Sequence, residues 1–134
     1  MTSKPFDMVE HLEPLCRWMF LRGVKVPARH EIPATGLVVS HNNQLITMGF
    51  LRKVEGDMGI WDGLVSNPEA SSAVRHEALD FAITELIGIA KELKMKSIFC
   101  WCADDNTHKR ALKHEFKPSQ FPGILTLELK NEDI

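Results

Sequence analysis

A chain of 134 residues is long enough for one domain with a substantial core and too short for two. Its apolar fraction of 44%, charged fraction of 25% and formal net charge of −2 are those of an ordinary globular protein, and they disfavour nucleic acid or an anionic membrane as the partner. No apolar run approaches the roughly 20 residues of a membrane span, no signal-peptide pattern opens the chain, and three cysteines, an odd number, favour reduced thiols in a cytoplasmic protein.

The N-terminal part predicts a helix from Pro5 to Gly23. Its apolar residues recur at helical spacing, Asp7 and Glu10 fit a capping box, and the glycine is a natural stop. The following stretch, residues 24–34, contains two prolines and several charges, so we expect a loop or a broken helix there.

Two strands joined by a tight turn are predicted next, over residues 36–40 and 44–53. Asn42 and Asn43 supply the turn, because asparagine tolerates the left-handed conformation that a short hairpin requires. Gly49 inside the second strand indicates a bulge or a close approach of another part of the chain.

A third strand is predicted over residues 58–66, and a long helix follows it to about Lys94. The helix has two candidate starts: Asn67 as the N-cap with Pro68 in the first turn, or a capping box of Ser66 and Glu69. Residues 96–103 are rich in β-forming side chains and predict another strand. Strand, crossover helix and strand make a right-handed βαβ unit, around which we expect the rest of the chain to pack.

The C-terminal part predicts a short helix over residues 107–115, capped by residues 104–106, and a closing strand over residues 123–129. The order of elements is therefore helix, hairpin, strand, long helix, strand, short helix, strand. No internal repeat or linker composition interrupts it, so we expect one domain over residues 1–134.

This order resembles the fold of the Gcn5-related N-acetyltransferases (GNAT) over roughly residues 7–129. The stretch Leu45–Phe50 is similar to the family's third strand, which commonly ends in Gly-Phe, and Gly63–Pro68 is similar to its fourth strand with the following proline. Asn106 opening the short helix, with Ala111, Leu112 and then Phe116, resembles a further family signature. The resemblance implies a single-domain α+β fold with a mixed, mostly antiparallel sheet, a central βαβ unit and helices on both faces.

The resemblance also implies acetyl-CoA as the cofactor, in the gap where the fourth and fifth strands separate. By this resemblance the backbone of Leu64, Val65 and Ser66 binds the pantetheine arm, and Asn106 either bonds that arm or simply caps its helix. The pyrophosphate is expected at the N-terminus of the long helix, where free N–H groups and the helix dipole attract an anion. The residues at that position are Ser71, Ser72, Ala73, Val74, Arg75 and His76.

The sequence departs from the family at this pyrophosphate loop. The family motif is Arg/Gln-x-x-Gly-x-Gly/Ala, and its first position falls on Ser71 while its glycine positions fall on Val74 and His76. Side chains at these two positions are expected to crowd a phosphate, unless the helix starts earlier or the ligand sits differently. Ser71, Ser72, Arg75 and His76 offer hydroxyl and cationic contacts as another way to hold an anion.

Acetyl transfer to an amine needs a base for the ammonium and a donor for the thioester carbonyl. Asp62, inside an apolar strand, is the candidate base, and the alternatives are that it faces solvent or is satisfied by a neighbouring strand. Many relatives protonate the leaving thiolate with a tyrosine. Lys113 stands at that position and the chain contains no tyrosine.

Two classes of function follow from these features. The first is an acyltransferase that acts on an amine of a small molecule or a protein, with the first helix and residues 24–34 setting the acceptor. The second is a non-catalytic GNAT-fold binding or regulatory module that has lost acetyl-CoA binding. A homodimer paired through strand edges is a further expectation from the resemblance. No metal site is expected, since Cys100 and Cys102 lack a second pair of ligands.

Overall fold

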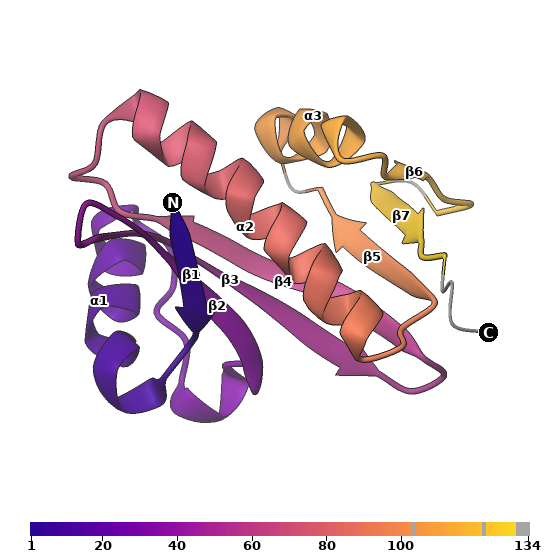
Figure 1. Cartoon of the computed structure of the whole chain (residues 1–134), viewed down its shortest axis with the longest axis horizontal. Coiled ribbons are helices and arrows are strands. Elements are labelled where there is room, and N and C mark those ends of the chain that lie inside the picture. The colour runs from indigo at the N-terminus through magenta and orange to yellow at the C-terminus, as the bar shows by residue number, and fades with distance from the viewer. Residues whose placement is uncertain (103, 122, 131–134) are drawn as a thin grey trace.

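The computed structural model describes residues 1–102, 104–121 and 123–130. Its sheet has seven strands in the order β1-β2-β3-β4-β5-β7-β6; β4 and β5 are parallel and the other neighbouring pairs are antiparallel (Figure 1). The strands are β1 (Thr2–Pro5), β2 (Thr35–His41), β3 (Gln44–Val54), β4 (Met58–Ser66), β5 (Ser97–Trp101), β6 (Lys117–Pro118) and β7 (Ile124–Glu128). The helices are α1 (Met8–Leu21), α2 (Ser72–Glu92), α3 (Asp105–Lys113) and the short 3-10 helix η1 (Arg29–Glu31). The predicted α+β fold with a mixed sheet and a central βαβ unit is confirmed.

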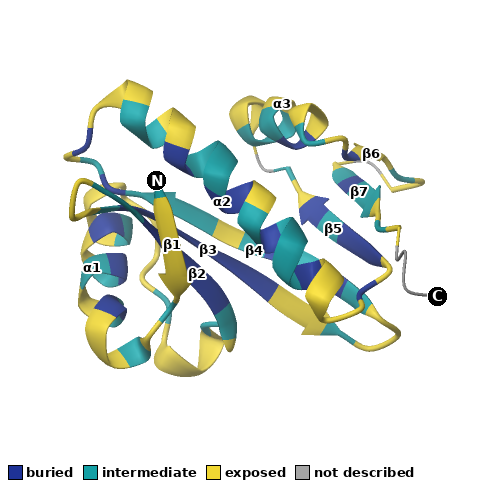
Figure 2. Cartoon of the chain, in the orientation of Figure 1, coloured by how far each residue is buried: buried dark blue, intermediate teal, exposed yellow. Residues whose placement is uncertain are grey.

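The helices cover both faces of the sheet, as predicted. On one face, Leu15 and Trp18 of α1 pack against Val38, Met48 and Phe50. On the other face the larger core forms between α2, α3 and the sheet, and the residues that α2 buries there are Ala78, Ala82, Ile83, Leu86 and Ala90. Figure 2 shows buried residues along the central strands and the sheet-facing sides of the helices, whereas β1 is exposed. The helix α1 therefore contributes an apolar stripe to the smaller core, and α2 and α3 contribute theirs to the larger one.

The start of α1 differs from the prediction, because residues 2–5 form an edge strand paired with β2. Asp7 is the N-cap, as expected, and its side chain accepts a bond from the Val9 N–H at 3.4 Å. The capping box is wrong: the Asp7 N–H donates to Nδ1 of the buried His11 at 2.8 Å, and Glu10 instead pairs with Lys4 at 3.0 Å. Four exposed residues carry no apolar alternation, so the sequence pattern gives no signal for this strand.

The start of α2 also differs, and both predicted starts are wrong. Ser71 is the N-cap, since its Oγ accepts the Val74 N–H at 3.3 Å, and the helix begins at Ser72. Asn67 is buried and has another role. Its side-chain amide donates to the Leu45 carbonyl of β3 at 3.0 Å, and its Oδ1 accepts the Glu69 N–H at 2.9 Å. This contact with a strand distant in sequence closes a turn between β4 and α2 in place of an early helical turn.

The other predicted elements are found close to their expected bounds. Asn42 and Asn43 form the β2–β3 turn with φ of 51° and 63°, in the left-handed region expected of them. The strand predicted over residues 96–103 is β5, which ends at Trp101, and Ala103 lies outside the described residues. The short strand β6 was not predicted, because two residues are too few to show a pattern.

Candidate functional site

A bulge in β4 opens the sheet at its centre. Leu51 of β3 pairs with Trp61 of β4, and Gly49 of β3 pairs with Leu64 of β4. These two pairs are two residues apart on β3 but three residues apart on β4. The additional residue lies at Asp62–Gly63, and Gly63 has φ of 92°, which favours glycine. The parallel pairing of β4 with β5 extends only to Trp61↔Cys100. The two strands therefore separate beyond this pair, and a cavity of about 450 Å³ lies there.

Five elements line this cavity, which we call the central cavity: the end of α1, β4, the start of α2, the end of β5, and α3. Six residues that the sequence predicted for cofactor binding come together in its lining. They are Leu64, Ser66, Ser72, Arg75, His76 and Asn106. Arg22 and Arg110 also line it, and the sequence did not indicate them. No local motif marks them, since they reach the cavity from elements distant in the chain.

The remaining predicted cofactor residues lie outside the lining. Ser71 caps α2, and Ala73 is exposed. Val65 packs with the core under α1, and Val74 packs with the core under α2. The side chain that replaces the family's first glycine thus lies against the core and is absent from the described lining of the cavity. His76, at the second glycine position, does line the cavity.

Beyond Trp61, the edge of β4 that faces β5 carries backbone groups that are not paired with a strand among the described residues. The Asn67 N–H donates to the Ile46 carbonyl at 2.7 Å, and the Val65 carbonyl accepts from Thr47 Oγ1 at 2.7 Å, so residues 65 and 67 face β3. Backbone groups alternate in direction along a strand, so those of Leu64 and Ser66 face the gap toward β5. Consistent with this, the Ser66 carbonyl accepts a bond from Arg22 Nε at 2.9 Å.

Positive charge gathers at the end of the cavity formed by α1 and α2. Arg22 also donates from Nη2 to Ser66 Oγ at 2.8 Å; burial lowers the pKa of its guanidinium, and the charge of Arg75 lowers it further. Nε of Arg75 is buried and has no hydrogen-bond partner among the described residues. The first N–H groups of α2, on Ser72 and Ala73, have no intrahelical partner either. Two guanidiniums beside a helix N-terminus form a site suited to an anion.

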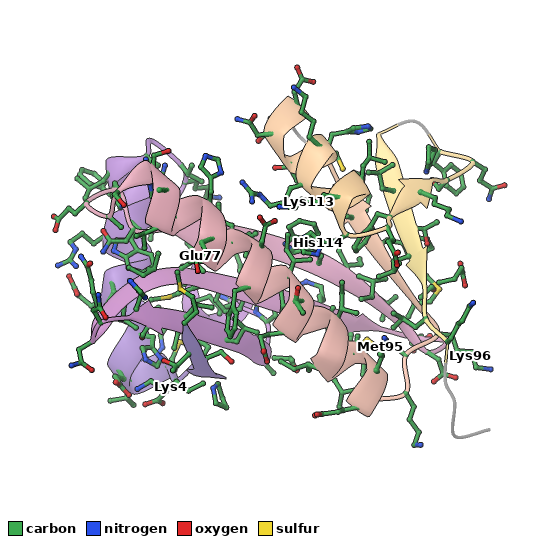
Figure 3. The ribbon with its side chains drawn as sticks, turned by 45° about the horizontal axis from the view of Figure 1, so that its top comes forward. Lys4, Glu77, Met95, Lys96, Lys113 and His114 are labelled. Atoms are coloured by element: carbon green, nitrogen blue, oxygen red, sulfur yellow. The ribbon has the colours of Figure 1, made fainter. Side chains whose placement is uncertain are left out.

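Asp80 of α2 holds α3 in place beside the cavity. Its carboxylate lies 3.1 Å from Arg110 Nη1, 2.8 Å from Lys113 Nζ and 3.0 Å from His114 Nε2. Figure 3 shows Lys113 and His114 extending from α3 toward α2. Lys113, which stands at the position of the family's tyrosine, thus pairs with Asp80 and is absent from the described lining of the central cavity.

We expect this cluster to make stability depend on acid pH. Burial by itself raises the pKa of Asp80, but hydrogen bonds from Lys113 and His114 and the charge of Arg110 outweigh it and lower the pKa from 3.8 to about 2. A carboxyl whose pKa is lower in the folded state stabilises the fold at any pH above its pKa in the unfolded state. This stabilisation is lost as the pH falls toward its pKa in the folded state. Asp80→Asn should cost about 2 kcal/mol of unfolding free energy at pH 7 and progressively less between about pH 4 and pH 2.

Urea unfolding across this pH range measures the difference, with Glu77→Gln on the exposed side of the same helix as the control. The control should change the unfolding free energy by less than about 0.5 kcal/mol. A deficit for Asp80→Asn that stays constant down to pH 2 would show that the ion pairs do not stabilise the fold.

A second cavity, of about 130 Å³, lies on the α1 side of β4. Its lining includes Asp62, Glu31 and the apolar side chains of Met19 and Val65. Gly63 lines both cavities, so they lie on either side of the β4 bulge. The Asp62 side chain is 44% exposed, and its Oδ2 accepts a bond from Arg52 Nε at 2.7 Å. The structure thus places Asp62 across the bulge from the residues predicted to bind the cofactor.

The cysteines are free, and burial raises the pKa of the Cys100 thiol, with Cys102 adding to the effect. Their sulfur atoms lie 3.9 Å apart. Within residues 1–102, 104–121 and 123–130, no three His, Cys, Asp or Glu side chains are grouped as metal ligands. In the same ranges, no helix combines the length and apolar character needed to cross a membrane.

The sequence matches no family model, and it matches no curated protein. The structure, however, is similar to solved structures of acetyltransferases. An aminoglycoside 6'-acetyltransferase type Ii superposes with a TM-score of 0.76 at 12% identity, over 96% of this chain and 97% of that one. A GNAT-family acetyltransferase from Staphylococcus aureus Mu50 gives 0.75 at 10% identity, over 96% and 99%. N-acetylglutamate synthase from Neisseria gonorrhoeae, complexed with coenzyme A and L-arginine, gives 0.71 at 16% identity, over 97% of this chain and 33% of that one. The TM-scores establish a shared fold, and identities this low establish nothing beyond the fold.

Proposed function

The chain has the fold of the Gcn5-related N-acetyltransferases, and from this premise we propose that it transfers an acetyl group from acetyl-CoA to an amine. The observation that carries the proposal is the separation of β4 from β5 beyond Trp61↔Cys100, with a cavity lined by arginines in the gap. A ligand with an amide-bearing arm and a phosphate-rich end matches such a site.

In this proposal the pantetheine arm bonds to the β4 backbone in the gap. Of the three predicted β4 residues, Leu64 and Ser66 have backbone groups that face the gap, whereas Val65 faces β3. Asn106 of α3 lines the same cavity, and in this proposal it contacts the arm. Arg22 already occupies the Ser66 carbonyl, so the arm either replaces that contact or uses Leu64. The pyrophosphate lies at the start of α2, on the N–H groups of Ser72 and Ala73 and the guanidiniums of Arg75 and Arg22.

Asp62 is the proposed base, reaching the acceptor through water from the α1 side of the bulge. It takes a proton from the ammonium; the amine nitrogen then forms the C–N bond to the acetyl carbon and releases its second proton to water as the C–S bond breaks. The Leu64 N–H, which faces the gap, stabilises the developing oxyanion. The thiolate departs without a tyrosine and is protonated by solvent, which is tolerable because thiolates are fairly good leaving groups.

The acceptor in this proposal is an amine of a small molecule or a protein that enters from the α1 side. The second cavity there joins a carboxylate, Asp62, to apolar side chains of α1, which suits a cationic group on an apolar body. We further propose a cytoplasmic protein and a homodimer, for which β1 offers an exposed strand at the edge of the sheet.

A thiol-release assay tests the activity: purified protein is incubated with acetyl-CoA and a panel of amines, and free CoA is measured. We expect release that depends on one class of amine. No CoA release with any amine would contradict the enzyme. If acetyl-CoA also fails to bind, the result would favour the alternative, a non-catalytic binding or regulatory module that has lost acetyl-CoA binding.

We predict that Arg75→Gln weakens acetyl-CoA binding by about 10- to 100-fold. The variant removes a charge-assisted hydrogen bond worth roughly 1.5–3 kcal/mol. Calorimetric titration measures the dissociation constant. Arg17→Gln is the matched control, because Arg17 is an exposed α1 residue that pairs only with Glu13 among the described residues, at 3.8 Å. Equal affinities for Arg75→Gln and the control would place the phosphates elsewhere.

A further inference from the structure

His76 and Arg110 form a fixed pair at the α3 side of the central cavity. Arg110 Nη2 lies 2.8 Å from His76 Nδ1, and Nη1 donates to the His76 carbonyl at 3.4 Å. A guanidinium has only donors, so Nδ1 must accept and the ring proton must be on Nε2. His76 therefore presents an N–H donor at the position where the resemblance led us to expect a glycine amide.

The pair is held from outside the cavity. Arg110 Nη1 lies 3.1 Å from Asp80 Oδ1, and the Arg110 side chain is only 13% exposed. Ser72, His76 and Asp80 follow one another at intervals of four on α2, so they share the face that looks toward α3. Because Asp80 and α3 fix Arg110, and Arg110 fixes the ring of His76, the donors of the pair are oriented before any ligand arrives.

The charges in the cavity exceed what one anionic group requires. Among its described lining residues, the arginines are Arg22, Arg75 and Arg110, and the single carboxylate is Asp104. Asp104 is engaged with the Thr107 N–H at 2.7 Å. Arg22 and Arg75, with the first amides of α2, suffice for a pyrophosphate. His76 follows Ser72 by four residues, about 6 Å along α2, so the His76–Arg110 pair forms a separate cluster of donors.

Coenzyme A has two separate anionic groups, the pyrophosphate and the 3'-phosphate, whereas dephospho-CoA has only the pyrophosphate. We propose that the His76–Arg110 pair binds the 3'-phosphate and makes the site selective for CoA over dephospho-CoA. The inference rests on the proposed function, since it assumes that the cavity binds CoA. Arg110 supplies charge and His76 supplies the Nε2–H donor; Asp80 is a positioning residue.

Titration calorimetry with CoA and with dephospho-CoA tests the proposal on the intact chain. The wild type should bind CoA at least about tenfold more tightly, since a charge-assisted hydrogen bond contributes enough for that ratio. Arg110→Gln and His76→Ala should each weaken CoA binding by about tenfold and change dephospho-CoA binding by less than about twofold. Lys109→Gln, which removes a charge from an exposed position on the same helix, should preserve the preference.

The outcomes separate this inference from the proposed function. If the wild type binds CoA and dephospho-CoA equally, or if the variants weaken both ligands alike, the pair does not read the 3'-phosphate and only this inference fails. The same holds if Lys109→Gln abolishes the preference, because net charge would then explain it. If neither ligand binds at millimolar concentration, the proposed function fails and this inference with it. The His76→Ala variant keeps the Asp80 ion pairs, so it remains informative if Arg110→Gln does not fold.

Discussion

Asp62→Asn is expected to lower kcat/KM for amine acetylation by about 10²- to 10⁴-fold, the contribution of a positioned general base. Asparagine has nearly the same shape but cannot accept the ammonium proton. Asp62 lies across the β4 bulge from the central cavity, and Gly63 lines both cavities. The affinity for acetyl-CoA should therefore change by less than about twofold, since the Asp62 side chain lines the second cavity and not the central one. Steady-state kinetics together with calorimetry measure the two quantities.

A control variant and a stability measurement sharpen this experiment. Asp57→Asn removes an exposed carboxylate from the turn before β4 and should leave kcat/KM unchanged. The ion pair of Asp62 with Arg52 is half-exposed, so its loss should cost at most about 1 kcal/mol of stability. A folded Asp62→Asn protein with wild-type kcat/KM would show that another group, or water, takes the proton.

Trp18→Ala is expected to have the largest effect on stability, about 3–5 kcal/mol of unfolding free energy. Trp18 is 1% exposed and anchors α1 to the smaller core, where it packs with Val38, Met48 and Phe50. Replacing it leaves a void that the neighbouring side chains of β2 and β3 cannot fill without moving. Because whole domains are stable by only about 5–15 kcal/mol, a change of this size should be obvious in urea unfolding.

Phe20→Ala on the same helix is the matched control. Phe20 is 74% exposed, so its truncation should cost less than about 0.5 kcal/mol. A small effect of Trp18→Ala, similar to that of Phe20→Ala, would mean that α1 is not packed on the sheet as described. Arg22 would then have no fixed position at the cavity.

The longer strands, β2 to β5 and β7, and the βαβ unit could be predicted from the sequence because they rest on local signals. Alternating apolar residues and the asparagine turn are properties of neighbours in the chain, and their expected bounds were nearly right. The start of α2 could not be predicted in this way. Asn67 has the side chain of an N-cap, but its amide is bonded to Leu45, 22 residues earlier, and a contact at that distance outweighs a local preference.

Only part of the site could be predicted, because the rest again depends on contacts between residues distant in the chain. Ser72, Arg75, His76 and Asn106 were found through a resemblance that fixes their place in the order of elements. Arg22 and Arg110 reach the cavity by contacts over 44 and 34 residues, respectively, and nothing in their own neighbourhoods indicates it. The effect of replacing the two glycines also depends on contacts that the sequence does not show. Val74 faces the core, and His76 is held by Arg110.

NMR titration of the ¹⁵N-labelled protein with acetyl-CoA tests the cofactor site most directly, because it reports both binding and its place. The proposed site predicts saturable shifts of the amides of Leu64, Ser66, Ser72 and Ala73, which lie on the open edge of β4 and the start of α2. The amides of β1 at the far edge of the sheet should not move. No shifts at millimolar acetyl-CoA, or shifts confined to residues away from the β4–β5 gap, would contradict an acetyltransferase site in this cavity.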